Sequence, residues 1–224
     1  SKRVIEKCGF RYEGTLRQAE RIYDGKVYDH LCYSLTRKEY QKESGYFESA
    51  EREEAMDKIS FAQVARPDQI RDIVEMAGRI WHQHYDSLLP AGQVDYMLEK
   101  YQSDAAIRKQ LIDGDIYFLM EYEGWSVGYS SVKVDEGTLF ISKVYIYKDW
   151  RGKKLFSALL DMYEHYCRAN GLAMMWLSVN RNNKESIAIY EHMGFVKEKK
   201  QITDIGNGYV MDDYIMVKRL NEGV

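Results

Sequence analysis

A short basic segment, Arg151-Gly152-Lys153-Lys154, has the residue types most easily matched to a chemical task in this 224-residue chain. It follows an apolar, β-branched and aromatic stretch at 139–147, which predicts a buried strand, and it precedes a helical apolar repeat at about 155–171. A loop that opens a helix turns free backbone N–H groups toward one point, where the helix dipole adds positive charge. The segment therefore predicts a phosphate site, although an ordinary turn with solvated lysines would show the same local pattern.

Composition and charge narrow the class of protein. Hydrophobic residues make up 45% of the chain and charged residues 30%, which is the balance of a globular protein. The net charge of −3 predicts no general attraction to nucleic acid or to a membrane surface, and no apolar run approaches the roughly 20 residues of a membrane span. The three cysteines, Cys8, Cys32 and Cys167, lack metal-ligand spacing. We therefore expect a cytoplasmic protein without a metal site.

Periodicity and turn signals predict a mixed α/β order from residue 59 onward. A helix is expected to begin at Pro67 and to present an apolar face as far as Trp81, and the Asn207-Gly208 pair predicts a closing hairpin. Strands are expected at 59–65, 116–122, 126–134, 139–147, 173–179, 195–206 and 209–219, and further helices at 93–101, 104–113, 155–171 and 183–193. This order predicts a mixed sheet with helices on its faces.

The N-terminal residues repeat the end of this pattern. Ser1, Glu6-Lys7-Cys8-Gly9-Phe10 and Glu13 match Ser186, Glu191-His192-Met193-Gly194-Phe195 and Glu198 at one constant offset. Residues 1–40 therefore look like the last part of a second domain, a helix end plus a β-hairpin, and suggest that the chain belongs to a longer tandem protein. The charged residues 41–57 predict a linker, which leaves 58–224 as the complete domain. A lone hairpin is marginal in water, so we expect it to pack on that domain or on a second copy in a homodimer.

Residues 59–220 resemble the GNAT acetyltransferase superfamily. The resemblance is carried by the basic loop, by Leu177-Ser178-Val179-Asn180-Arg181-Asn182-Asn183 and by Ala188-Ile189-Tyr190-Glu191-His192-Met193-Gly194-Phe195. Residues 208–216 resemble the polyamine-acetyltransferase-like branch typified by PaiA, and residues 6–14 resemble the tail of RimJ/RimL-type acetyltransferases. The resemblance implies an α/β fold with a mixed, mainly antiparallel sheet flanked by helices, preceded here by a partial second GNAT unit.

The resemblance also implies a site. The strand before the loop would splay from its neighbour, so that the pantetheine arm of acetyl-CoA pairs with Val144, Tyr145 and Ile146. Asn183 would contact the cofactor, and Tyr190 would protonate the departing CoA thiolate, although a core tyrosine would show the same apolar spacing. The pyrophosphate would sit on the loop residues Arg151, Gly152, Lys153, Lys154, Leu155, Phe156 and Ser157.

Two features depart from the family pattern. Lys154 and Phe156 stand where the family loop has small residues, and we expect Lys154 to keep an ordinary helical backbone. The family's frequent general-base glutamates are replaced by Ser142 and Ser178. The remaining alternatives for a base are a water relay and three side chains that are each more often structural, namely His82, His84 and Asp213.

The function implied by the resemblance is acetyl-CoA-dependent N-acetyl transfer. The primary amine of a small molecule such as a polyamine, or of a peptide, would attack the thioester directly, and a strand N–H near Ile146 would hold the oxyanion. The acceptor pocket would form from residues 80–98 and the final hairpin. Its mixture of Trp81, His82, His84, Tyr85 and Asp212-Asp213 would suit an amine cation, but a solvated surface explains these residues as well. The alternative function is a non-catalytic acyl-CoA-binding or interaction module on the same fold.

Overall fold

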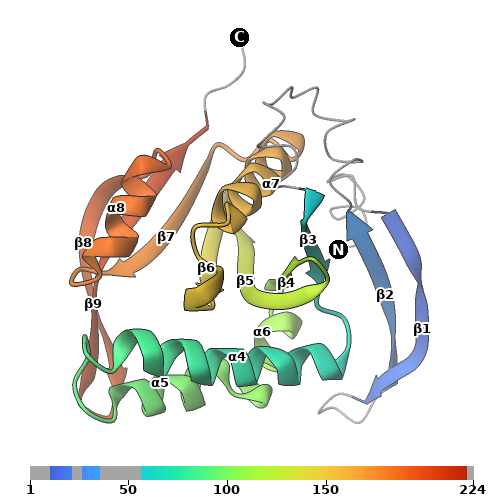
Figure 1. Cartoon of the computed structure of the whole chain (residues 1–224), viewed down its shortest axis with the longest axis horizontal. Helices are drawn as coiled ribbons and strands as arrows, with labels where there is room; N and C mark the ends of the chain where they lie inside the picture. Colours follow the sequence, from blue (N-terminus) through green and yellow to red (C-terminus); the bar gives the residue numbers. More distant parts are fainter. Residues whose placement is uncertain (1–10, 22–26, 36–56, 221–224) are drawn as a thin grey trace.

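The computed structural model describes residues 11–21, 27–35 and 57–220, and within them nine strands form one sheet (Figure 1). The strands are β1 (Arg11–Arg21), β2 (Val27–Leu35), β3 (Ile59–Gln63), β4 (Ile116–Tyr122), β5 (Trp125–Asp135), β6 (Thr138–Ile146), β7 (Met174–Asn180), β8 (Val196–Gly206) and β9 (Tyr209–Arg219). Their order is β1-β2-β3-β4-β5-β6-β7-β9-β8, and every neighbouring pair except β6 and β7 is antiparallel. The predicted mixed, mainly antiparallel sheet is confirmed.

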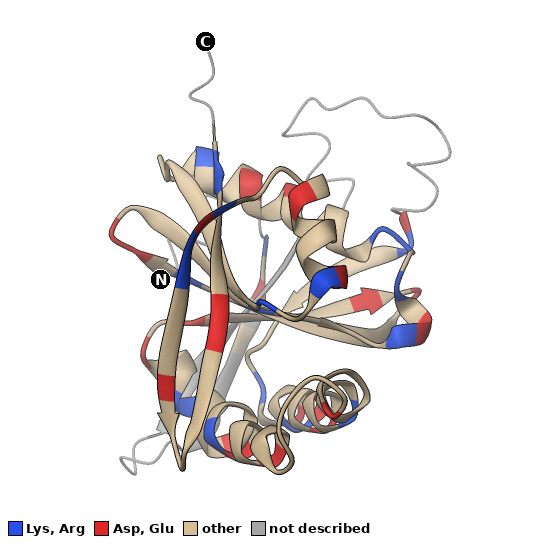
Figure 2. Ribbon diagram, turned by 90° about the vertical axis from the view of Figure 1, so that its left-hand side faces the viewer, with Lys and Arg blue, Asp and Glu red and all other residues tan. Residues whose placement is uncertain are grey.

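Helices cover both faces of this sheet (Figure 1). They are α4 (Pro67–Tyr85), α5 (Gln93–Gln102), α6 (Asp104–Ile112), α7 (Leu155–Ala169) and α8 (Lys184–His192), with a 3₁₀ turn, η1 (Lys148–Trp150), before α7. The first three pack on one face, and α7 and α8 pack on the other. Figure 2 shows Lys and Arg interspersed with Asp and Glu along these elements.

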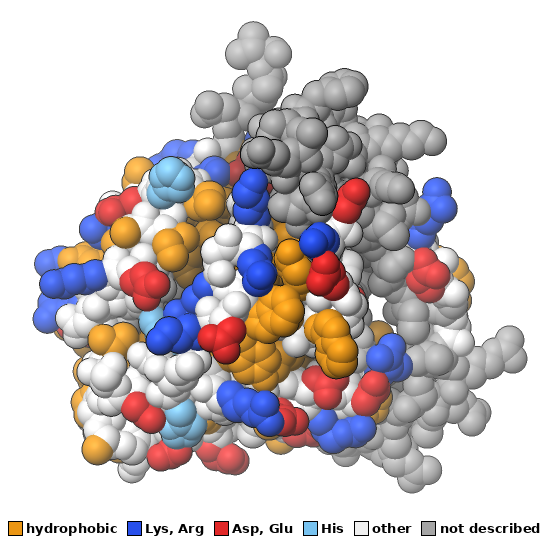
Figure 3. Space-filling view, viewed as in Figure 1, with side chains coloured by type: hydrophobic (Ala, Val, Ile, Leu, Met, Phe, Trp, Pro, Cys, Tyr) orange, Lys and Arg blue, Asp and Glu red, His pale blue; other side chains and the backbone are white. Residues whose placement is uncertain are grey.

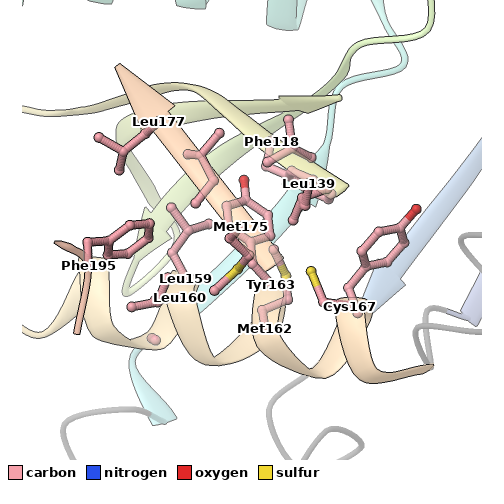
Figure 4. Close-up of a cluster of buried hydrophobic side chains, with 14 of the residues drawn as sticks. Phe118, Leu139, Leu159, Leu160, Met162, Tyr163, Cys167, Met175, Leu177 and Phe195 are labelled. Atoms are coloured by element: carbon pink, nitrogen blue, oxygen red, sulfur yellow. The ribbon is translucent and has the colours of Figure 1, made fainter. Parts of the chain in front are cut away.

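The apolar face of α7 forms the larger of two cores (Figure 4). Leu159 and the free thiol Cys167 are fully buried, and they pack with Leu139 of β6 and Met175 of β7. The helical spacing of apolar residues in the sequence therefore matches the buried face. Because one helix contacts both strands, α7 ties together the two parts of the sheet that meet at β6 and β7.

The second core lies between α4, α5, α6 and the opposite face of the sheet. Ile73, Ile80 and Trp81 of α4 are almost fully buried, as the predicted apolar face requires. They share a cluster with Tyr117 of β4 and Tyr129 of β5, whose side chains are inaccessible to solvent. This core therefore contains tyrosine hydroxyls that need partners inside the protein.

The closing hairpin forms at the predicted turn. Asn207 and Gly208 both have positive φ angles, 54° and 76°, which is the backbone of a two-residue turn that matches the twist of the flanking strands. The hairpin carries β9 alongside β7, where Asn180 pairs with Asp213. This register brings residues of the C-terminal segment to the point where β6 and β7 separate.

The strands β6 and β7 pair only at their beginnings. Their parallel register covers Leu139 with Met175 and Phe140 with Trp176, and no later pair. The divergence that the resemblance implies is therefore present. On its other side, β6 carries a bulge, because the register with β5 passes from Lys143 directly to Ile141 and leaves Ser142 without an opposite residue.

The N-terminal hairpin extends the sheet beyond β3. β1 pairs with β2 as predicted, and β2 pairs with β3 through Ser34–Ala62 and Leu35–Phe61. This is one of the two arrangements expected for the hairpin. The helix end predicted near the N-terminus and the linker predicted at 41–57 lie outside the described residues, and so does Cys8. The division into domains stays a prediction.

Candidate functional site

A cavity of about 720 Å³ opens where β6 and β7 diverge. Residues 140–146 line one side and residues 177–180 the other, while α4 and α5 close one end and the loop before α7 borders the opposite end. Apolar side chains gather in the middle of the face seen in Figure 3, with charged side chains around them. The incomplete strand pairing thus creates space within a sheet that is otherwise continuous.

The basic loop bends through two left-handed residues. Gly152 has a φ of 76° and Lys154 a φ of 62°, and Lys154 is the N-cap of α7. The expectation that Lys154 keeps an ordinary helical backbone is therefore wrong, because only a left-handed residue turns the chain into the helix here. Glycine adopts this conformation freely, whereas lysine does so at a cost. The bend directs the N-terminus of α7, with its unpaired N–H groups, toward the bordering cavity.

The cavity gathers almost every residue predicted to bind the cofactor. Arg151 lies at its edge and donates a hydrogen bond from Nε to the backbone oxygen of Ile146 at 3.3 Å. Lys153 is the exception, since its Nζ lies 5.2 Å and 5.5 Å from the ring centroids of Tyr122 and Trp150. The predicted residues in the lining are Val144, Tyr145, Ile146, Arg151, Gly152, Lys154, Leu155, Phe156, Ser157, Asn183 and Tyr190.

Tyr190 is half-buried in the lining between two aromatic rings. Its ring centroid lies 5.5 Å from that of Phe156 and 5.9 Å from that of Phe195, both in edge-to-face geometry. Phe156, which is bulky where the family loop is small, therefore positions this tyrosine. Burial raises the pKa of Tyr190, so its hydroxyl keeps its proton at neutral pH. A protonated hydroxyl in a cavity can act as a proton donor.

Asn183 is buried and already has partners for both polar atoms of its side chain. Its Oδ1 accepts a hydrogen bond from the backbone of Ser186 at 3.2 Å, which caps α8, and its Nδ2 lies 2.9 Å from Nε2 of His84. Asn183 thus fixes the start of α8 and the ring of His84. Its predicted contact with the cofactor stays a prediction.

The three candidate bases occupy different environments. His82 is exposed, pairs with Asp86 and Asp95 at 3.1 Å and 3.4 Å, and does not line the cavity. His84 lines it, but burial lowers the pKa of its imidazole, and its Nε2 faces Asn183. Neither histidine therefore presents a free basic nitrogen to a ligand.

Asp213 is a buried carboxyl group in the cavity lining, with 7% of its surface exposed. Burial raises its pKa from 3.8 to about 6, while the nearby hydroxyl of Ser178 acts in the opposite direction. The group is therefore largely ionised at neutral pH and ready to accept a proton or a cation. Its neighbour Asp212 is paired instead with Arg181 at 2.8 Å and is absent from the lining.

The lining also contains a residue that the sequence did not single out, Lys143. Lys143 is a charged residue of β6, and yet only 7% of its surface is exposed. The bulge at Ser142 shifts the alternation of β6 by one residue, and the sequence carries no signal for that shift. Of the residues predicted to suit an amine cation, Trp81, His84, Tyr85 and Asp213 line the cavity.

Comparison with known proteins shows which proteins this chain resembles. Residues 80–195 match the Acetyltransferase (GNAT) family. An uncharacterized N-acetyltransferase from Escherichia coli, YjgM, is 34% identical over 86 residues, which are 37% of this chain and 52% of that relative. The chain therefore spans about half the length of this curated relative.

Solved structures share the fold at low sequence identity. The PaiA N-acetyltransferase of Thermoplasma acidophilum, in complex with coenzyme A, superposes with a TM-score of 0.61 at 18% identity, covering 72% of this chain and 99% of that one. A GCN5-related N-acetyltransferase from Rhodopseudomonas palustris gives a TM-score of 0.60 at 18% identity, covering 71% and 94%. In the described ranges, no helix has the length and apolar character of a membrane span, and no cluster of side chains is suited to a metal ion.

Proposed function

The chain belongs to the GNAT acetyltransferase family, whose match covers residues 80–195, and from this premise we propose that it is an acetyl-CoA-dependent N-acetyltransferase. The observation that carries the proposal is the cavity between the diverging strands, because it joins three features in one space. These are open strand edges on β6, a basic loop at the start of α7, and a protonated Tyr190. The residues present therefore fit acetyl-CoA, a cosubstrate with a polar arm, a diphosphate and a thioester.

The cofactor would lie along β6 with its phosphates at the loop. The pantetheine arm would pair with the backbone at 144–146, where β7 offers no ladder partner. The pyrophosphate would accept hydrogen bonds from the N–H groups that begin α7 and would be neutralised in part by Arg151 and Lys154. This arrangement would bring the thioester into the cavity that Tyr190 and Asp213 both line.

The proposed reaction is direct transfer. The amine nitrogen attacks the thioester carbonyl carbon, a C–N bond forms, and the C–S bond breaks. A backbone N–H near Ile146 holds the oxyanion, and Tyr190 gives its proton to the departing thiolate. The amine loses one proton, and we assign its acceptance to Asp213, because this carboxyl is ionised at neutral pH and buried beside the cavity. Carboxylate and aromatic side chains around it suit a primary amine, of a small molecule or of a peptide.

The test of this mechanism is the Tyr190→Phe substitution. Removal of the hydroxyl should lower kcat about a hundredfold while the affinity for acetyl-CoA, measured by calorimetry, stays unchanged. Tyr96→Phe is the matched control, since Tyr96 donates its hydroxyl to the backbone of Ile205 outside the cavity and should retain normal turnover. Unchanged turnover in Tyr190→Phe would rule out its role as the acid.

A second function is favoured by Ser142 and Ser178, which stand where the family often has glutamates. A protein without that base could bind an acyl-CoA and transfer nothing. Calorimetry with acetyl-CoA and a broad screen of amines separates the two functions, because binding without turnover of any amine identifies the binding module. A homodimer and a cytoplasmic location stay predictions from the sequence.

A further inference from the structure

The cavity contains a buried cation on the face of the sheet covered by α4, α5 and α6. Nζ of Lys143 lies 2.5 Å from Oε1 of Gln110, 3.1 Å from Oγ of Ser142, and 5.1 Å from the ring centroid of Tyr117. These partners are neutral. Burial lowers the pKa of Lys143 to about 8, so the ammonium form still predominates at neutral pH.

No carboxylate among the described residues lies within 4 Å of this ammonium. The acidic group that acts on this ammonium is Asp115, which favours the charged form of Lys143 from beyond 4 Å; Lys143 in turn opposes the burial-raised pKa of Asp115 more strongly than does Lys133, its ion-pair partner at 3.9 Å. Asp115 therefore compensates this buried charge without direct contact and is shared with Lys133, whereas a buried ion is best stabilised by a partner in direct contact. Lys143 lines the cavity, so a ligand can add an anionic group in direct contact with it.

A second polar group in the same region also lacks a partner. Trp81 is 3% exposed and lines the cavity, and its indole Nε1–H is buried without a hydrogen-bond acceptor. The Tyr129 hydroxyl donates to Oε1 of Gln102 at 3.3 Å, and it interacts with the indole without completing a hydrogen bond. An unsatisfied buried donor is uncommon in folded proteins, and it indicates an acceptor that the protein itself does not contain.

The two donors share the α4 side of the cavity with Tyr145, whose ring centroid lies 5.2 Å from that of Trp81. At the other side of the divergence, Asp213 supplies the only buried carboxylate among the described lining residues. β7 lies between β6 and β9, and β6 diverges from β7 after Phe140, so Lys143 and Asp213 lie on opposite sides of the divergence, farther apart than the about 10 Å of two paired strand spacings. The cavity therefore has a cationic end and an anionic end.

We propose that the acceptor carries a carboxylate as well as its amine, and that the carboxylate binds at Lys143 and Trp81 while the amine faces Asp213 and the thioester. This inference rests on the proposed acetyltransferase function and narrows it to amines of the ω-amino acid type, with several bonds between the two groups. A polyamine of the same length would instead bring a second cation to the Lys143 ammonium, which costs binding energy. The cations of the basic loop serve the cofactor phosphates and are not part of this site.

Matched pairs of acceptors test the proposal on the unaltered protein. δ-Aminovalerate and cadaverine have the same chain length, as do γ-aminobutyrate and putrescine, and they differ in carrying a carboxylate or a second amine. With acetyl-CoA saturating, kcat/KM should be about tenfold or more higher for the amino acid of each pair. A preference for the diamines would overturn the proposal.

The Lys143→Met variant keeps an unbranched side chain of nearly the same length and removes its charge. It should raise KM for the amino acids about tenfold, leave kcat/KM for the diamines unchanged or higher, and bind acetyl-CoA normally. Lys143→Arg should restore the preference in part. An equal loss for both classes of acceptor would show a structural role and reject the assignment.

Binding measurements separate this proposal from the proposed function. Calorimetric titration of δ-aminovalerate into the protein loaded with CoA should give binding that Lys143→Met loses and that cadaverine does not show. If no amine is acetylated but this binding is present, the enzyme assignment fails and the carboxylate site stands. If acetylation occurs without any dependence on Lys143, the enzyme assignment stands and the carboxylate site is rejected.

Discussion

Replacing Lys154 with glycine is expected to make the protein more stable, because Lys154 is a left-handed residue at the start of α7. Its φ of 62° and ψ of 10° place it in the region where an L side chain crowds the following carbonyl. Glycine has no Cβ and occupies this region without strain. The path of the loop therefore imposes this left-handed conformation on Lys154 against the backbone preference of lysine.

The size of the gain follows from two opposing terms. Relief of the left-handed conformation is worth about 1–2 kcal/mol. Glycine also makes the unfolded chain more flexible, which costs about 0.5–1 kcal/mol. The free energy of unfolding should therefore rise by roughly 0.5–1 kcal/mol, which for a domain of this size raises Tm by about 1–4 °C.

The matched control for this change is Lys154→Ala. It removes the same charge as Lys154→Gly but keeps a Cβ at positive φ, so the difference between the two variants isolates the backbone strain. Urea denaturation followed by circular dichroism measures it. An alanine variant as stable as the glycine variant would refute the reasoning. Both variants should bind acetyl-CoA more weakly than the wild-type protein, because both lose a cation beside the proposed phosphate site.

Two further predictions concern groups in the interior. In the folded protein the pKa of Asp213 is raised to about 6, so folding favours the protonated carboxyl. The stability that this protonation contributes is lost as the pH rises through about 6. Asp213→Asn should therefore gain stability relative to wild type between about pH 4 and pH 7, by up to about 3 kcal/mol in urea titrations, and a constant difference would contradict the raised pKa. Leu159→Ala removes a fully buried side chain under the sheet and should cost about 2–5 kcal/mol, whereas Ile202→Ala at a site 70% exposed should change little; similar losses would contradict the assigned core.

Local patterns in the sequence were sufficient to predict the elements and their order. The apolar face of α4, the strand at 116–122 and the Asn207-Gly208 turn each depend on neighbouring residues, and each is present in the structure. The pairing of β6 with β7 over only two residues depends on how distant segments pack, so its extent was implied by resemblance and not by the residues of either strand. The β2–β3 pairing likewise joins segments on either side of residues 36–56, and no local pattern indicates it.

Apart from Lys153, the residues predicted from the loop and the two motifs line one cavity, and the differences from expectation have physical causes. The left-handed backbone of Lys154 was missed because lysine rarely adopts it and the sequence offers no glycine there. Lys143 was missed because a lysine in a strand normally faces solvent, and a single bulged residue reverses that expectation. Asp213 was one of several candidates until burial and position separated it from His82 and His84.

The short ladder between β6 and β7 also bears on how the protein unfolds. Backbone hydrogen bonding divides the sheet into two blocks, one ending at β6 and one containing β7, β9 and β8, and two residue pairs join them. Cooperativity between the blocks must therefore pass through helices: through α7, whose buried face contacts both, and through α5, which donates hydrogen bonds to the β8–β9 hairpin from Gln93 and Tyr96. A molecule bound along the open edge of β6 would supply part of the missing connection. The two blocks would then unfold together more when the cavity is occupied than when it is empty.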